Sequence, residues 1–149
     1  MAQNSNDVLL KLMDERNDLY AINSTYNLSC STYGLTILIR ENMHVKCLKL
    51  MSNCKEVAAN CAYLHLLVNM SVVSQCVADM LSIDLISILT ALVSTNIEGS
   101  VRTDASRLLI AIVSAGESFL NRIARKQVVQ IVNLIMPDIA AERSDDSKY

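Results

Sequence analysis

Two pairs of residues in this chain have the types and the helical spacing of metal ligands. His44 and Cys47 are three positions apart, and Cys61 and His65 are four apart, so each pair would share one face of a helix. Together they offer the two Cys and two His side chains that a tetrahedral zinc ion accepts. Structural zinc sites usually involve tight loops, however, and Cys is also a common small buried residue. We therefore expect no metal and no other cofactor, with a zinc-dependent helical domain as the weaker alternative.

The sequence offers little that would support catalysis. It contains two His, and it has no Gly-rich phosphate loop and no H-E-x-x-H or G-x-S-x-G motif. Asp14, Glu15 and Asp18 form an acidic cluster, but Lys11 and Arg16 lie beside them, as on an ordinary solvated helix. No general acid and base are expected within reach of each other. The sequence predicts a protein that is not an enzyme.

The composition indicates an all-helical protein. Of the 149 residues, 52% are apolar, yet the chain has only one Phe, no Trp, three Gly and one Pro. Strands favour β-branched and aromatic residues, and hairpins favour turns that contain Gly, whereas Leu, Ile, Val, Ala, Met and Ser dominate here. The length suffices for one domain with a sizeable core. The net charge of −2 argues against general nucleic-acid binding.

The most apolar stretch, residues 62–81, is expected to be buried in protein and not in lipid. Polar side chains that would be costly in a membrane interrupt it: His65, Asn69, Gln75 and Asp79. The polar first residues lack the basic segment of a signal peptide. The odd number of Cys, five, is typical of reduced thiols. We therefore expect an intracellular protein, cytoplasmic or nuclear, with no membrane span.

A short pattern returns at a spacing of about 42 residues. Residues 25–29 read TYNLS, residues 67–71 read LVNMS and residues 109–114 read LIAIVS. Apolar residues at helical spacing extend the recurrence to whole segments, and a period of 20–50 residues is typical of repeat proteins. The pattern predicts long helices at about 21–28, 57–70 and 101–112, short helices at about 35–39, 73–80 and 117–126, and medium helices at about 45–51, 85–92 and 128–135.

The order of long, short and medium helices at this period resembles the armadillo repeat. The long helix of that family carries a pattern like E-V-R-x-x-A-x-x-L-x-N-L-S. This chain has Glu56-Val57, Val101-Arg102 and Asn69-Met70-Ser71 at matching places. The resemblance covers about residues 15–139 and implies a right-handed α-solenoid of about three repeats. The Gly that the family has between its first and second helices is missing in every copy, so a HEAT-like arrangement of helix pairs is the alternative.

The resemblance to the armadillo repeat also predicts one helical-repeat domain at residues 7–141. Residues 1–6 and the polar tail 142–149 are expected to be disordered, and residues 7–16 form an amphipathic pattern that would cap the first repeat. The last repeat stops after its second helix, so its apolar face needs another covering. The candidate interface residues on that face are Val129, Val132 and Ile135.

The resemblance also implies a function in protein interaction. In that family the Asn of the long helix hydrogen-bonds the backbone of an extended peptide on the concave face, and a Trp packs on its side chains. Asn27 and Asn69 hold the Asn position here, and Tyr26, Val68 and Ile110 hold that of the Trp. The residues expected to line the groove one turn earlier are Asn23, His65 and Arg107. We predict a scaffold or adaptor for a protein or an extended peptide segment, and Arg107 would favour an acidic residue in that partner.

The charge distribution leaves a second function open. From Glu56 to Val101 the chain has no Lys or Arg, and Asp79, Asp84 and Glu98 are the other charges in this stretch. A helix that is apolar nearly all round is covered on several sides, either by neighbouring helices or by another chain. The alternative function is therefore structural self-assembly into a homo-oligomer, or a role as one piece of a longer solenoid.

Overall fold

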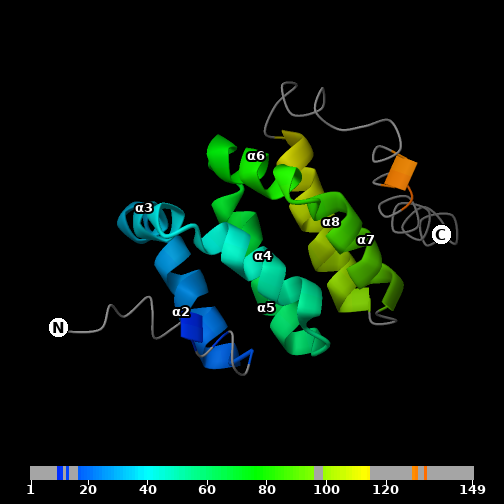
Figure 1. The fold of residues 1–149 in the computed structure, drawn as a ribbon, viewed down its shortest axis with the longest axis horizontal. Coiled ribbons are helices and arrows are strands. Elements are labelled where there is room, and N and C mark those ends of the chain that lie inside the picture. Colours follow the sequence, from blue (N-terminus) through cyan, green and yellow to red (C-terminus); the bar gives the residue numbers. More distant parts are fainter. Residues whose placement is uncertain are drawn as a thin grey trace, which may run out of the picture.

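The computed structural model of the chain describes residues 10, 11, 13, 17–95, 99–114, 129, 130 and 133. Within these residues seven helices can be followed from end to end, and no described residue belongs to a strand (Figure 1). The prediction of an all-helical protein is therefore confirmed. The helices are α2 (Leu19–Ser29), α3 (Thr32–Arg40), α4 (Met43–Asn53), α5 (Val57–Met70), α6 (Ser74–Ser82), α7 (Leu85–Thr95) and α8 (Gly99–Ser114).

Each helix that the sequence predicts between residues 21 and 112 is present, with ends that differ by a few residues. Of the amphipathic pattern at 7–16, the described residues Leu10, Lys11 and Met13 are helical, and Met13 is fully buried. The helix predicted at 117–126 and the disorder predicted at both ends lie outside the described residues, and within the helix predicted at 128–135 the described residues 129, 130 and 133 are helical. The domain limits 7–141 therefore stay a prediction.

Helix α5 lies at the centre of the fold. It packs against α2 on one side and against α8 on the other, and α4 also contacts it. The molecule extends from α2 and α3 at one end to α7 and α8 at the other, with α4, α5 and α6 between them (Figure 1). The three helices that carry the recurring sequence pattern, α2, α5 and α8, are therefore neighbours in space.

The central position of α5 explains its composition. The helix contains no Asp, Glu, Lys or Arg, because neighbouring helices cover it on several sides and leave little room for a solvated charge. One buried polar group, Asn60, joins α5 to the preceding helix: its Nδ2 donates to the carbonyl oxygen of Cys54 at 3.2 Å. The buried residues of α5 are Ala59, Asn60, Ala62, Tyr63, Leu64, Leu66, Leu67 and Met70.

Among the described residues other than Gly, Asn17, Asn42 and Asp84 have positive φ, and the last two lie at corners between helices. Asn42, just before α4, has φ of 54°, and Asp84, just before α7, has φ of 71°. Asn and Asp adopt this region more readily than other residues that have a Cβ. The two corners are 42 residues apart in the chain, which is the period of the sequence pattern. The two corners therefore share a backbone conformation and lie at equivalent places, one before α4 and one before α7.

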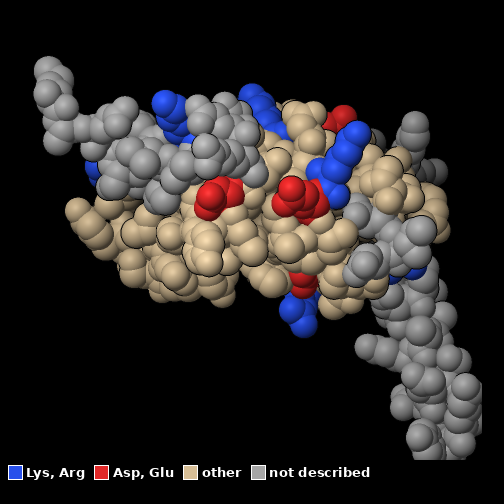
Figure 2. Space-filling view, turned by 90° about the horizontal axis from the view of Figure 1, so that it is seen from below, with Lys and Arg blue, Asp and Glu red and all other residues tan. Residues whose placement is uncertain are grey.

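The described surface is poor in charge over wide areas. Figure 2, which views the molecule from below Figure 1, shows a mostly uncharged face with most of its Lys and Arg side chains along the upper edge. Among the described helices none is by itself long and apolar enough to cross a membrane. Helices α6 and α7 pass that test of length and composition together, although they are bent by 72° where they meet.

Candidate functional site

Four side chains form a continuous row across α2, α5 and α8. The ring centroids of Tyr26 on α2 and His65 on α5 are 6.5 Å apart, with the rings tilted by 58°. His65 Nε2 lies 3.0 Å from Asp104 Oδ2 on α8. Arg107 Nη1, one turn further along α8, lies 3.5 Å from Asp104 Oδ1. We call Tyr26, His65, Asp104 and Arg107 the three-helix row.

Asp104 is the buried member of this row. Its side chain is 9% exposed, whereas those of His65 and Arg107 are 48% and 66% exposed. Asp104 and Arg107 are three positions apart and so share one face of α8. The Asp104 carboxylate therefore offsets part of the positive charge of Arg107. A guanidinium has five N–H donors, so Arg107 retains donors that a partner could use.

The Asn69 side chain hydrogen-bonds a neighbouring helix. Its Nδ2 donates to Ser29 Oγ at 3.0 Å and lies 3.6 Å from Cys30 Sγ. Ser29 is the last residue of α2 and Cys30 follows it, while Asn69 is in the last turn of α5. The Asn69 amide therefore ties the end of α5 to the end of α2. Its carbonyl Oδ1 is the atom of this side chain best suited to accept a hydrogen bond from a partner.

The other predicted groove residues lie on the same three helices. Asn23 and Asn27 are exposed on α2, Val68 is half-buried on α5, and Ile110 is 54% exposed on α8. Of the candidate interface, Val129 is exposed, whereas Val132 and Ile135 lie outside the described residues.

The residues that sequence reasoning missed are Ser29, Cys30 and Asp104. Only Asp104 had a signal in the sequence, its position three residues before Arg107.

The two pairs of candidate zinc ligands turn to other partners. His44 contacts Asp79 and His65 contacts Asp104. Cys47 is fully buried, and burial raises the pKa of its thiol to about 12, which disfavours the thiolate that binds metals. No three His, Cys, Asp or Glu side chains within the described ranges come together where one metal ion could bind them. The zinc alternative therefore has no site in that part of the chain.

A buried histidine links α4 to α6. His44, 1% exposed, donates from Nε2 to Asp79 Oδ2 at 2.9 Å. Gln75 Nε2 donates to the other carboxylate oxygen at 2.8 Å. These two hydrogen bonds hold the pKa of Asp79 below its ordinary value of 3.8, and the bond from His44 has the larger effect. They lower the pKa because they favour the ionised form of the carboxyl group. His44 Nδ1 is buried and has no hydrogen-bond partner among the described residues, so Nε2 is the polar contact of this ring there.

Replacing Asp79 with Asn is expected to make the fold less sensitive to acid. The folded pKa of Asp79 lies below its unfolded value, so its carboxylate stabilises the fold above about pH 4. That stabilisation is lost as the pH falls through the folded pKa. Urea unfolding at several pH values between about 2 and 6 would measure the effect, which we expect to be about 1 kcal/mol. Glu41→Gln, which removes another carboxylate, is the control, and an equal loss of acid sensitivity in both variants would contradict this account.

Fold and site together define a class of protein. It is all-helical, with seven described helices, and three successive helices in space, α2, α5 and α8, present a row of polar and aromatic side chains. No protein-family model matches the chain, and neither the curated proteins nor the solved structures contain a significant match. Its function is therefore argued from its own residues.

Proposed function

We propose that this chain is a non-catalytic scaffold or adaptor that binds an extended segment of a partner protein across α2, α5 and α8. We further propose that its helices form an armadillo-like right-handed solenoid. The observation that carries the proposal is the three-helix row, in which side chains of three adjacent helices contact one another in order. The left-handed corner residues, 42 positions apart, support a repeating unit of that length.

The residues around the row have the chemistry to bind an extended peptide. The exposed amides of Asn23 and Asn27 on α2 can each donate to and accept from a peptide backbone. Tyr26 and Ile110 offer apolar surface at opposite ends of the row, and Arg107 favours an acidic side chain. Tyr and Arg are also the residue types that most often dominate the affinity of interfaces.

Binding is expected to depend on the α8 end of the row. Peptides selected from a displayed random library on the wild-type protein would be measured by fluorescence anisotropy against Ile110→Asp and Arg107→Glu. We expect each substitution to weaken binding by at least about tenfold, or about 1.4 kcal/mol. Tyr33→Asp and Arg40→Glu place the same new charges on exposed positions of α3 and should change the affinity less than about twofold.

Selected peptides that bind all four variants equally would exclude this face as the binding site.

Self-assembly is the second candidate function, and the exposed side chain of Val129 is the observation that favours it. Light scattering over a wide concentration range separates the two proposals. A molar mass that rises with concentration, and that Val129→Asp returns to the monomer value, would favour assembly.

A further inference from the structure

A concave surface lies between α4 and α7. It is a groove of about 640 Å³, and every residue that lines it belongs to α4, to the two residues after α4, or to α7. None of its lining residues belongs to α2, α5 or α8, so it is separate from the three-helix row. Its volume falls within the range of about 300–1,000 Å³ that is typical of ligand sites.

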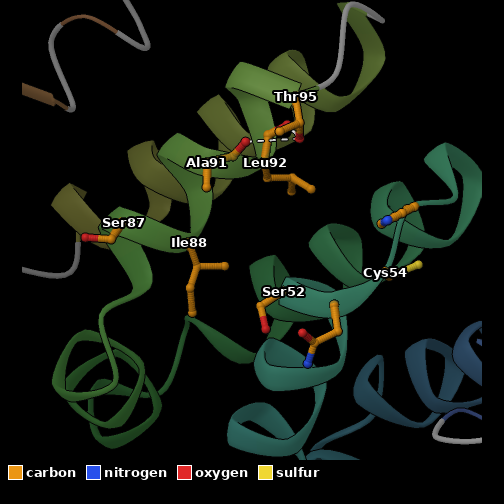
Figure 3. A pocket seen from close by; sticks show the side chains of 9 residues that line it. Ser52, Cys54, Ser87, Ile88, Ala91, Leu92 and Thr95 are labelled. Carbon is orange, nitrogen blue, oxygen red and sulfur yellow. Dashed lines mark hydrogen bonds between the residues drawn. The ribbon is translucent and has the colours of Figure 1, made fainter.

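The two walls of the groove differ in chemistry. Helix α7 has no charged residue along its whole length, and it lines the groove with Ile88, Ala91 and Leu92. Figure 3 shows Ile88 and Leu92 extending from α7 toward the α4 side, where Ser52 faces them. Ile88 is half-buried and Ala91 is exposed, so apolar surface on this wall is accessible to a ligand.

The α4 wall is basic. Helix α4 carries Lys46 and Lys49 and no Asp or Glu, and Lys55 lines the groove just beyond its end. Lys46 and Lys49 precede Asn53, which lines the groove, by seven and four positions. Helical spacing therefore puts all three residues on one side of α4. In the described part of the chain no ion pair joins Lys46, Lys49 or Lys55 to a carboxylate.

We propose that the α4–α7 groove is a second binding site, and that its ligand is a peptide segment of a partner protein with apolar side chains flanked by acidic ones. The apolar side chains would cover Ile88, Ala91 and Leu92, and the acidic ones would pair with Lys55 and with the lysines of α4. Charge complementarity selects this occupant, because the groove lining includes one cation and no carboxylate. Apolar burial supplies most of the affinity, and the lysines supply orientation and discrimination against basic segments.

The test uses two short fluorescein-labelled peptides of the same length, one of Leu, Ala and Glu and one in which Lys replaces every Glu. Binding to the full chain is followed by fluorescence anisotropy. The acidic peptide is expected to bind at least about tenfold more tightly than the basic one. Ala91→Glu, which places a carboxylate on the apolar wall, and Lys55→Glu are each expected to weaken it by at least about tenfold.

Matched variants place the same changes elsewhere. Ala58→Glu alters an exposed Ala of α5, and Arg40→Glu reverses the charge of an exposed Arg of α3. Neither variant should change the affinity for the acidic peptide. Arg107→Glu should also leave it unchanged, which distinguishes failure of this site from failure of the three-helix row. Equal affinity for both peptides, no saturable binding of the acidic peptide, or binding that Ala91→Glu does not weaken would overturn the proposal. The protein could also bind dodecanoate and not the acidic peptide. If Ala91→Glu abolished that binding, the result would overturn the proposal and assign the groove to a small amphiphile.

Discussion

Replacing Gly34 with Ala is expected to destabilise the fold by about 3 kcal/mol. Gly34 lies in the first turn of α3, against the end of α2, and a Cβ at this position would overlap the backbone carbonyl of Leu28. Neither helix can move away at low cost. The Gly34 N–H donates to Ser31 Oγ at 3.0 Å, and this bond caps α3 and holds its start close to α2. The added methyl group must therefore break the cap or separate the two helices.

Gly99→Ala is the matched control for this prediction. Gly99 is the first residue of α8, and a Cβ there would meet nothing within 4 Å. Ala has the higher helix propensity and restricts the unfolded chain, so this variant should be as stable as the wild type or more stable by up to about 1 kcal/mol. Urea unfolding measures both variants. Similar stability in the two would show that the α2–α3 corner adapts to a side chain.

Replacing Tyr63 with Ala is expected to cost about 4 kcal/mol, at the upper end of the range for truncating a large core side chain. Tyr63 is fully buried in α5, the helix that contacts α2, α4 and α8. Its hydroxyl donates to Asn17 Oδ1 at 3.1 Å, just before the start of α2. Truncation would therefore leave a cavity in the centre of the fold and release a link to the N-terminal helix.

Tyr63→Phe separates these two contributions. It keeps the ring and removes the hydroxyl, so it should lose only about 1 kcal/mol, the usual net value of one hydrogen bond. Chemical denaturation at one pH and temperature compares wild type, Phe and Ala at this position. A loss from Phe as large as that from Ala would show that the hydroxyl, and not ring packing, is the main source of the stability.

The helices were predictable from the sequence because their signals are local. The spacing of apolar residues identifies α2 to α8. The stretch without Lys or Arg between Glu56 and Val101 includes α5, the central helix that its neighbours cover. The corners were only partly predictable. No Gly in the sequence marks these corners, and it is Asn42 and Asp84 that adopt the left-handed conformation there.

The candidate site was predictable only as a set of positions. A constant offset along the chain grouped Tyr26 with Val68 and Ile110, and grouped His65 and Arg107 with Asn23. In the structure Tyr26, His65 and Arg107 form one row of contacts with Asp104. The part played by Asp104 depends on how α8 is rotated against α5, and no periodicity reports that rotation. The bond from Asn69 to Ser29 likewise depends on how two helix ends meet.

The α4–α7 groove was not predictable for a related reason. Hydrophobic periodicity tells which residues turn away from water, and it correctly marks Ile88 and Leu92 as residues of a packed face. It does not tell where two such faces fail to meet fully. A groove is a property of the distance between helices, which depends on the side chains and corners on either side of it.

The central position of α5 has a consequence for how the domain holds together. Helices α2 and α8 are at different ends of the molecule, and each packs more extensively against α5 than against any other helix. Loss of α8 would leave the contacts between α2 and α5 in place. Loss of α5 would remove the main packing contacts of both α2 and α8 at once. We therefore expect the cooperativity of unfolding to depend mainly on this one helix.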